Sequence, residues 1–466
     1  MQVRASGRED RGPRSPARPL RARGAALNLR ALRRSLVLLA AACLVGSPAR
    51  AAQDAVDLVF GDTLQGYFGS SVSGFSDFDR DGTEDFAVAI PCDNQNRLPL
   101  SGSVKIFRGS RPPVERLNLQ GENPGDLFGS AVARIGDLDC DGIDEVLVGA
   151  PGASTVGRGS GKAYVFSGTD ARIIFRLLGD EPGDEFGASV CDVGDLNHDF
   201  KHEFAVAAPG ARKNGRNSGT VRVFDGADAH VVYWFHGDAF GERFGTSLAG
   251  PGDMDGDGIP ELAVGAPCPR LDRPGYARIL SGADATILYT FGGQHTWELF
   301  GASLAAVGDS DGDGRADLFV GAPASRSGAM DLDAAVDHAC GAATLFSGGT
   351  GKPILSVASE VSEDRLGSSL ALGPDLDGDG VRDLLVGATQ RLRPRNGCVR
   401  AYGARSGSLL GTWIGLNPGE QFGSTIAVLE STKGPPLLVV GSPTDAQRGG
   451  SGVGRVSLIV LDGAKR

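Results

Sequence analysis

The sequence repeats one pattern seven times, and this repetition limits the folds that the chain can adopt. A Phe-Gly pair, replaced once by Leu-Gly, recurs at intervals of 56 to 66 residues, and Gly-Ala-Pro or a close variant follows about 20 residues later. The pairs are Phe68-Gly69, Phe128-Gly129, Phe186-Gly187, Phe244-Gly245, Phe300-Gly301, Leu366-Gly367 and Phe422-Gly423. A fixed period of this kind indicates units that bury their faces against their neighbours.

Each unit predicts four β-strands. Examples are Ser70–Ser73 after a Phe-Gly pair, Glu145–Val148 before Gly-Ala-Pro, the Gly-x-Val-x-Val-Phe segment 219–224, and the aliphatic run Ile173–Leu178. Ser-Gly or Asp-Gly turns separate the third and fourth strands. A solenoid is the alternative, but a repeat of about 59 residues is long for one. We therefore expect an all-β fold, a seven-bladed β-propeller of four-stranded blades.

The two ends of the repeat region predict how the ring closes. Asp57–Phe60 matches a fourth strand, whereas Arg455–Val460 matches a third strand. We expect one blade to combine three C-terminal strands with one N-terminal strand, which leaves no open edge between the ends of the ring.

Composition supports this fold and separates the chain into two parts. The chain contains 71 glycines in 466 residues, and 41% of its residues are hydrophobic, which excludes collagen and disorder. Residues 1–50 carry eleven arginines against Glu9 and Asp10, a charge of +9. Since the whole chain carries -11, the remainder carries -20. An acidic body argues against nucleic acid as a partner.

The N-terminal region is typical of an export signal. A basic segment precedes the apolar run Leu36–Val45 and the small-residue sequence Ser47–Ala51. Ten apolar residues are too few to span a bilayer, and no later segment predicts a transmembrane helix. We expect a secretory signal region at 1–51, a single propeller domain at 52–466, and a secreted, periplasmic or cell-surface location. The export route, general or twin-arginine, stays open.

Export also permits disulfide bonds. Six of the seven cysteines lie after the predicted signal region, and none of them form a Cys-x-x-Cys spacing. They can form disulfides or remain buried free thiols.

An acidic loop lies between the first and second predicted strands of six units. It reads Asp-x-Asp-x-Asp-Gly-x-x-Asp/Glu, with acids or their substitutes at positions 1, 3, 5 and 9. The candidate metal ligands are Asp77, Asp79, Asp81, Asp85; Asp137, Asp139, Asp141, Glu145; Asp195, Asn197, Asp199, Glu203; Asp253, Asp255, Asp257, Glu261; Asp309, Asp311, Asp313, Asp317; and Asp375, Asp377, Asp379, Asp383. The seventh unit has 430–434 at this place and lacks the pattern.

Hard oxygen donors at this spacing predict Ca²⁺, with Gly at position 6 where the loop turns sharply. Magnesium retains waters and requires a strict octahedron, and zinc requires His or Cys ligands. An EF-hand requires Glu at position 12 and flanking helices, but position 12 is valine in all six loops and strand sequence follows. We expect five to six sites, because Phe200 and Asn197 weaken the third loop.

The Phe-Gly…Gly-Ala-Pro unit with its acidic loop resembles the FG-GAP repeat of integrin α-subunit propellers and of exported bacterial proteins. The resemblance covers about residues 57–463. It implies a seven-bladed propeller with Ca²⁺ loops on one face. Integrin α-subunits also contain leg domains and a transmembrane helix, which this sequence does not show. We therefore expect the resemblance to cover the propeller and not the receptor role.

These observations predict a calcium-stabilised, monomeric binding or adhesion module for an extracellular protein or carbohydrate. The ligand face is expected opposite the calcium loops, where long loops carry basic residues, namely Arg212, Lys213, Arg216, Arg391, Arg393 and Arg395. The alternative is a propeller-type polysaccharide lyase or hydrolase, or the accessory domain of an extracellular enzyme. No catalytic residues are predicted, since His-Glu-x-x-His and Gly-x-Ser-x-Gly motifs are missing.

Overall fold

The computed structural model describes residues 49–51, 55–94, 98–268, 273–324, 340–390, 396–445 and 452–461. The chain divides into two units, Met1–Gly46 and Ser47–Arg466, and the fold below is that of the second unit. Most of the predicted signal region therefore lies outside the described residues. So do the loop arginines Arg391, Arg393 and Arg395.

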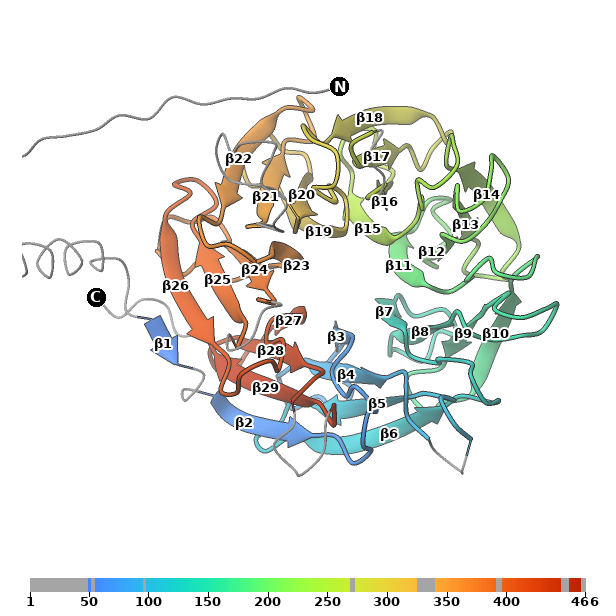
Figure 1. Cartoon of the computed structure of the whole chain (residues 1–466), viewed down its shortest axis with the longest axis horizontal. Helices are drawn as coiled ribbons and strands as arrows, with labels where there is room; N and C mark the ends of the chain where they lie inside the picture. Colours follow the sequence, from blue (N-terminus) through green and yellow to red (C-terminus); the bar gives the residue numbers. More distant parts are fainter. Residues whose placement is uncertain are drawn as a thin grey trace, which may run out of the picture. The chain divides into compact units, whose positions relative to one another are not determined.

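Every regular element in the described ranges is a β-strand, and the strands form seven sheets around a centre (Figure 1). Blade one contains β3 (Val72–Phe75), β4 (Asp85–Ile90), β5 (Ser103–Arg108) and β6 (Val114–Gln120). Blade two contains β7 (Ala131–Ile135), β8 (Glu145–Ala150), β9 (Lys162–Phe166) and β10 (Ile173–Leu178). Blade three contains β11 (Ser189–Gly194), β12 (Glu203–Ala208), β13 (Thr220–Phe224) and β14 (Val231–His236).

The remaining blades continue the same antiparallel order. Blade four contains β15 (Ser247–Gly252), β16 (Glu261–Ala266), β17 (Tyr276–Leu280) and β18 (Ile287–Gly292). Blade five contains β19 (Ser303–Gly308), β20 (Asp317–Ala322), β21 (Ala342–Phe346) and β22 (Pro353–Ala358). Blade six contains β23 (Leu366–Leu372), β24 (Leu384–Ala388), β25 (Cys398–Tyr402) and β26 (Leu409–Ile414). The first strand of each blade faces the centre of the ring (Figure 1). The predicted seven-bladed all-β propeller is confirmed.

The seventh blade closes the ring as predicted. Its strands are β27 (Thr425–Leu429), β28 (Leu437–Ser442), β29 (Arg455–Val460) and the N-terminal β2 (Ala55–Phe60). The sheet order is β2-β29-β28-β27, and Phe60 pairs with Arg455. Strands from both ends of the chain therefore hydrogen-bond within one sheet, which ties the ends of the ring together.

One strand was not predicted from the sequence. β1 (Ala49–Ala51) pairs in parallel with β26, the outermost strand of blade six. Three residues within a segment expected to be a cleavage site gave no strand signal.

The Phe-Gly and Gly-Ala-Pro motifs form the contact between consecutive blades. Gly187 of blade three lies so close to Gly149 of blade two that a Cβ on Gly149 would meet the Gly187 carbonyl oxygen at 1.8 Å. Within blade two, Gly129 N donates to Gly149 O at 2.9 Å. Phe128, which precedes Gly129, is 1% exposed and packs edge-on against Tyr164. Glycine is required where backbones meet this closely, which explains why both motifs recur in the blades.

The cysteines of the described residues favour the free-thiol alternative. Cys92, Cys140, Cys191 and Cys398 are free thiols, and the last two are buried. Burial raises the pKa of the Cys191 and Cys398 thiols well above the ordinary range. The described part of the chain holds no helix long and apolar enough to cross a bilayer.

Candidate metal centres and the opposite face

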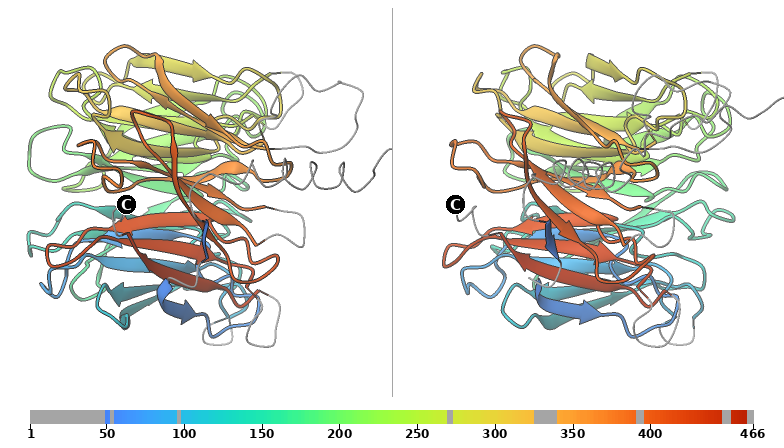
Figure 2. Two further views of the ribbon diagram at one scale, coloured as in Figure 1. Left: turned by 90° about the vertical axis from the view of Figure 1, so that its left-hand side faces the viewer. Right: turned by 60° about the vertical axis from the view of Figure 1, so that its left-hand side comes forward.

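The six acidic loops connect the first and second strands of blades one to six, so they lie on one face of the ring. Figure 2 shows the blades edge-on, with connecting loops at both faces. Position 9 of the loop opens the second strand in blades one to five and precedes it by one residue in blade six. These six carboxylates are at most 1% exposed, and they are Asp85, Glu145, Glu203, Glu261, Asp317 and Asp383.

A repeated hydrogen-bond pattern shapes each loop. In the second loop, Asp137 accepts from Asp141 N at 3.1 Å and from Gly142 N at 2.8 Å. Asp141 accepts in turn from Ile143 N at 2.9 Å. The carboxylates at positions 1 and 5 therefore hold the loop in its turn conformation. Corresponding bonds are present in the other five loops.

The position-9 carboxylate is held on one side by the loop backbone. Leu138 N donates to Glu145 Oε2 at 2.6 Å, while Glu145 Oε1 is buried and finds no hydrogen-bond partner among the described residues. Oε1 of Glu261 is in the same situation. In blades one, five and six the position-9 residue is aspartate, and its second oxygen accepts a backbone bond, which in Asp85 comes from Gly109 N at 2.8 Å. An unpartnered buried carboxylate oxygen is costly, and a bound cation would satisfy it.

The structure brings together some predicted ligands more closely than others. In loops two, four and five, carboxylate oxygens at positions 1, 3 and 9 lie within 4.8 Å of one another. In loop one, carboxylate oxygens at positions 1, 3 and 5 lie within 4.8 Å of one another. These clusters are of a size that can hold one ion with oxygen ligands.

Burial raises the pKa of the position-9 carboxyls, and the other acids of each loop raise it further. The pKa rises to about 6 for Asp85, about 8 for Glu145 and about 7 for Glu261. The carboxyls of Asp317 and Asp383 each have a pKa of about 6. A divalent cation in the loop would reverse this effect, because it favours the ionised carboxylate.

The backbone agrees with glycine at position 6 and reveals a second constraint. Gly142 and Gly258 have φ of 87° and 89°, as expected for the sharp turn. Position 4 is also left-handed, and in the first three loops it is not glycine: Arg80, Cys140 and His198 have φ of 58° to 61°. The sequence pattern gave no signal for position 4, although glycine occupies it in loops four to six.

The third loop keeps the turn but changes its centre. Phe200 occupies position 6 with φ 72° and is 92% exposed. Asn197 Nδ2 donates to Glu203 Oε1 at 3.3 Å and to Asp225 Oδ2 at 3.2 Å. The Asn197 amide group, at position 3, therefore donates to acids where the other loops have a carboxylate.

The seventh loop, which lacks the acidic pattern, contacts the first loop. Thr432 N donates to Gly82 O at 2.8 Å, and Glu84 N donates to Glu430 O at 3.0 Å. Lys433 Nζ donates to the carbonyl oxygen of Asp81. A loop predicted only to lack metal ligands thus joins blades seven and one.

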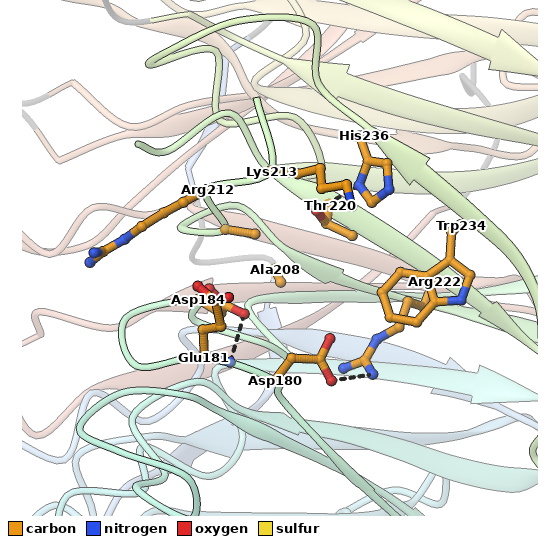
Figure 3. Close-up of a pocket in the computed structure, with 11 residues that line it drawn as sticks. Asp180, Glu181, Asp184, Ala208, Arg212, Lys213, Thr220, Arg222, Trp234 and His236 are labelled. Carbon is orange, nitrogen blue, oxygen red and sulfur yellow. Dashed lines mark hydrogen bonds and ion pairs between the residues drawn. The ribbon is translucent and has the colours of Figure 1, made fainter. Parts of the chain in front are cut away.

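The opposite face carries the loops that join blades and those that join second to third strands. Two of the predicted basic residues there, Arg212 and Lys213, line a cavity of about 630 Å³ in blade three (Figure 3). Acidic residues of the loop from β10 to β11 form its other side. The predicted basic loop therefore borders a cavity that sequence reasoning had not placed.

Ion pairs between a third strand and the loop entering the same blade recur on this face and were missed in the sequence. Their members are Lys105–Asp62, Lys162–Glu122, Arg222–Asp180, Arg278–Asp238, Arg400–Asp364 and Arg455–Glu420. The sequence signal for these ion pairs is a basic residue at the first or third position of the third strand.

Comparison with known proteins agrees with this architecture. The FG-GAP repeat model matches residues 128–166, 186–224, 244–267, 300–330 and 366–397. Integrin alpha-5 of Xenopus laevis is 34% identical over 217 residues, which cover 43% of this chain and 20% of the relative. Integrin alpha-8 of Mus musculus is 30% identical over 231 residues, covering 46% of this chain and 21% of the relative. The match thus spans about one-fifth of these relatives.

Solved structures show the same fold at low identity. BBS1N, from a crystal structure in complex with ARL6DN soaked with mercury, has a TM-score of 0.52 at 11% identity, covering 87% of this chain and 94% of that chain. Sqt1 of Saccharomyces cerevisiae has a TM-score of 0.50 at 11% identity, covering 88% and 99%. With its seven blades and repeated motifs, the chain is an FG-GAP repeat protein whose propeller is similar to that of integrin α-subunits.

Proposed function

We propose that this protein is an exported, calcium-binding propeller that binds an extracellular protein or glycan. The calcium ions are structural. They are held by the acids of the loops between first and second strands, at five sites or at six if the third loop also binds. The ligand is bound by the opposite face.

The observation that carries the calcium proposal is the buried carboxylate at position 9. Glu145 and Glu261 each have one buried oxygen without a partner among the described residues, beside two further acids within 4.8 Å. All these donors are oxygens, which is the ligand set of Ca²⁺. The pKa of Glu145 is raised to about 8, first by burial and then by the nearby Asp139, Asp137 and Asp141, so an ionised carboxylate there is costly without a cation.

The similarity to integrin α-subunits supports a binding role, and the loops provide a surface for it. Variable loops on a rigid scaffold are where binding sites usually form. The predicted signal region supports export. The proposal includes monomeric behaviour and no interaction with nucleic acid, in keeping with the acidic body of the chain.

Thermal unfolding of the full chain, stripped of metal and then titrated with Ca²⁺, tests the calcium proposal. At millimolar calcium and dissociation constants of about 10⁻⁴–10⁻³ M, each site should add about 1 kcal/mol to the free energy of unfolding. A clear rise in Tm with Ca²⁺, and a much smaller rise with Mg²⁺, is expected. An identical Tm in chelator and in millimolar calcium would rule out structural calcium.

The matched variants are Glu261→Gln and Glu360→Gln. The first removes a position-9 carboxylate from the fourth loop, whereas Glu360 is an exposed residue of the loop from β22 to β23 on the opposite face. Calcium titration by calorimetry should show one site fewer in Glu261→Gln and an unchanged number in Glu360→Gln. Equal stoichiometry in both variants would remove Glu261 from the ligand set.

A further inference from the structure

The cavity in blade three is formed by three segments of different character (Figure 3). The loop from β10 to β11 provides Asp180, Glu181 and Asp184, and the loop from β12 to β13 provides Arg212 and Lys213. β13 and β14 provide the remaining wall, with Arg222, Trp234 and His236. A volume of about 630 Å³ is in the range of sites that hold small organic ligands.

Charge in the cavity is balanced and separated. Three acids lie on one side, and the basic residues Arg212 and Lys213 lie on the other. The third basic residue, Arg222, is committed to its own partners, since Nη1 lies 3.3 Å from Asp180 Oδ1 and Nη2 donates to Leu178 O at 2.7 Å. A strongly anionic ligand would meet the acids and a cationic ligand the bases, so the lining favours a neutral ligand with both donors and acceptors.

Arg222 also fixes the aromatic part of the wall. Its guanidinium lies 3.9 Å from the ring centroid of Phe186 and 5.1 Å from that of Trp234. Arg222 is 8% exposed, whereas the Trp234 side chain remains 49% exposed. An indole held in place but half open to solvent offers a flat apolar surface at the edge of a polar cavity.

Two further groups of the cavity wall can bind a ligand: the Asp184 carboxylate and the His236 imidazole. Asp184 is 6% exposed, and its Oδ1 is buried without a hydrogen-bond partner among the described residues. Its other oxygen accepts from Glu181 N at 3.0 Å. Burial and the nearby Lys213 lower the pKa of His236, so a neutral imidazole lies beside Thr220 Oγ1 at 3.0 Å. The wall therefore contains an acceptor that needs a donor and an uncharged ring that can accept or donate.

We propose that this cavity binds a neutral oligosaccharide. One pyranose ring packs its apolar C–H face against Trp234, and the hydroxyls of this ring and its neighbours in the oligosaccharide donate to Asp180 and Asp184 and accept from Lys213 and Arg212. Sugar hydroxyls fit both walls because each one donates and accepts. This inference rests on the proposed function, because it names the glycan alternative and assigns it a site.

Isothermal titration of the full chain in millimolar Ca²⁺ tests the proposal with defined probes. The probes are the neutral tetrasaccharides of glucose, mannose, galactose and xylose, with tetragalacturonate as the anionic counterpart. We expect at least one neutral tetrasaccharide to bind, and tetragalacturonate to bind at least tenfold more weakly. Preference for the anion, or binding of none of the neutral probes, overturns the proposal.

Variants locate the site. Trp234→Ala and Asp184→Asn should each weaken binding of the neutral probe at least tenfold. Trp297→Ala is the matched control, because Trp297 is 44% exposed and lies in the loop from β18 to β19, outside the cavity. Equal losses in Trp297→Ala and Trp234→Ala, or no loss in Trp234→Ala, would place sugar binding elsewhere and refute this site.

The calcium dependence of Tm, measured on the same samples, distinguishes failure of the sugar site from failure of the proposed function. If Tm rises with Ca²⁺ but no neutral probe binds, the sugar site is wrong and the calcium-binding propeller stands. If Tm does not respond to Ca²⁺, the proposed function fails. Loss of neutral-probe binding in Trp234→Ala would then still support a sugar site in the cavity. A protein ligand whose binding is abolished by Trp234→Ala, without neutral sugar binding, would also overturn the carbohydrate assignment.

Discussion

Arg455 of β29 and Glu420 of the loop between β26 and β27 form a completely buried ion pair, with 2.8 Å between Nη2 and Oε2. Nη1 of the same arginine lies 2.9 Å from Asp445 Oδ2. The pair lies in the blade that contains strands from both ends of the chain. It is the most deeply buried of the six pairs that join a third strand to the loop entering its blade.

Arg455→Met is expected to lower the free energy of unfolding by about 3–5 kcal/mol, because it leaves Glu420 and Asp445 buried without their cation. Urea unfolding followed by fluorescence measures the change. Arg176→Met is the control, since Arg176 is exposed and pairs with the exposed Glu122 at 3.0 Å, and it should cost less than about 1 kcal/mol. Equal costs in both variants would show that burial of the Arg455 pair is unimportant.

In metal-free protein, stability should fall as pH rises from about 5 to 8. Burial raises the folded-state pKa of Glu145 to about 8 and of Glu261 to about 7, above the ordinary value of 4.5, so the folded chain retains protons that the unfolded chain releases in this window. Calcium competes with those protons, so in millimolar Ca²⁺ the fall should disappear or reverse. Tm measured at pH 5, 6, 7 and 8, with and without calcium, checks the sign.

Glu145→Gln is the companion variant for that titration. The neutral amide cannot ionise, so the fall in metal-free Tm above pH 6 should become shallower. A metal-free Tm that instead rises with pH in the wild-type chain would contradict the raised pKa values of these carboxyls.

Phe200→Gly should stabilise the chain by about 0.5–1 kcal/mol. Phe200 has φ 72°, which costs a non-glycine residue about 1–2 kcal/mol, and the greater unfolded-state entropy of glycine offsets part of the gain. The opposite kind of change in the fourth loop, Gly258→Ala, should destabilise by a similar amount, because Gly258 has φ 89°. A Cβ there would meet no atom within 4 Å, so the cost comes from the backbone conformation and not from a clash. Chemical unfolding in chelator compares both with the parent chain, and shifts of the same sign in the two variants would contradict the prediction.

Lys433→Met should lower the Tm of metal-free protein and increase the rise in Tm that calcium produces. The ammonium group donates to the carbonyl oxygen of Asp81 in the first loop, so it joins blades seven and one and adds positive charge beside a candidate Ca²⁺ site. Calcium titration by calorimetry should show tighter binding at one site. The exposed Lys352 provides the control variant Lys352→Met; an equal response in both would exclude a specific effect of Lys433.

The repeat motifs and the strand pattern around them predicted the number of blades, the four-stranded unit and the ring closure, because the motif glycines meet a neighbouring blade in a fixed way. Gly149 and Gly187 recur with their motifs since no side chain fits between them. The spacing of the acids likewise predicted acids that lie close together, three of the four in loops one, two, four and five, because nine consecutive residues fold locally. The calcium itself, the export signal and the ligand remain predictions.

Tertiary structure alone decided the relationships between residues that the chain keeps far apart. The seventh loop contacts the first through Lys433 and Asp81, which are separated by 352 residues, and no local pattern records that contact. The same holds for the cavity near Trp234, where a loop between blades meets two strands of the next blade. Periodic motifs specify contacts that recur in every blade, whereas side chains that differ between blades form sites only once the ring has closed.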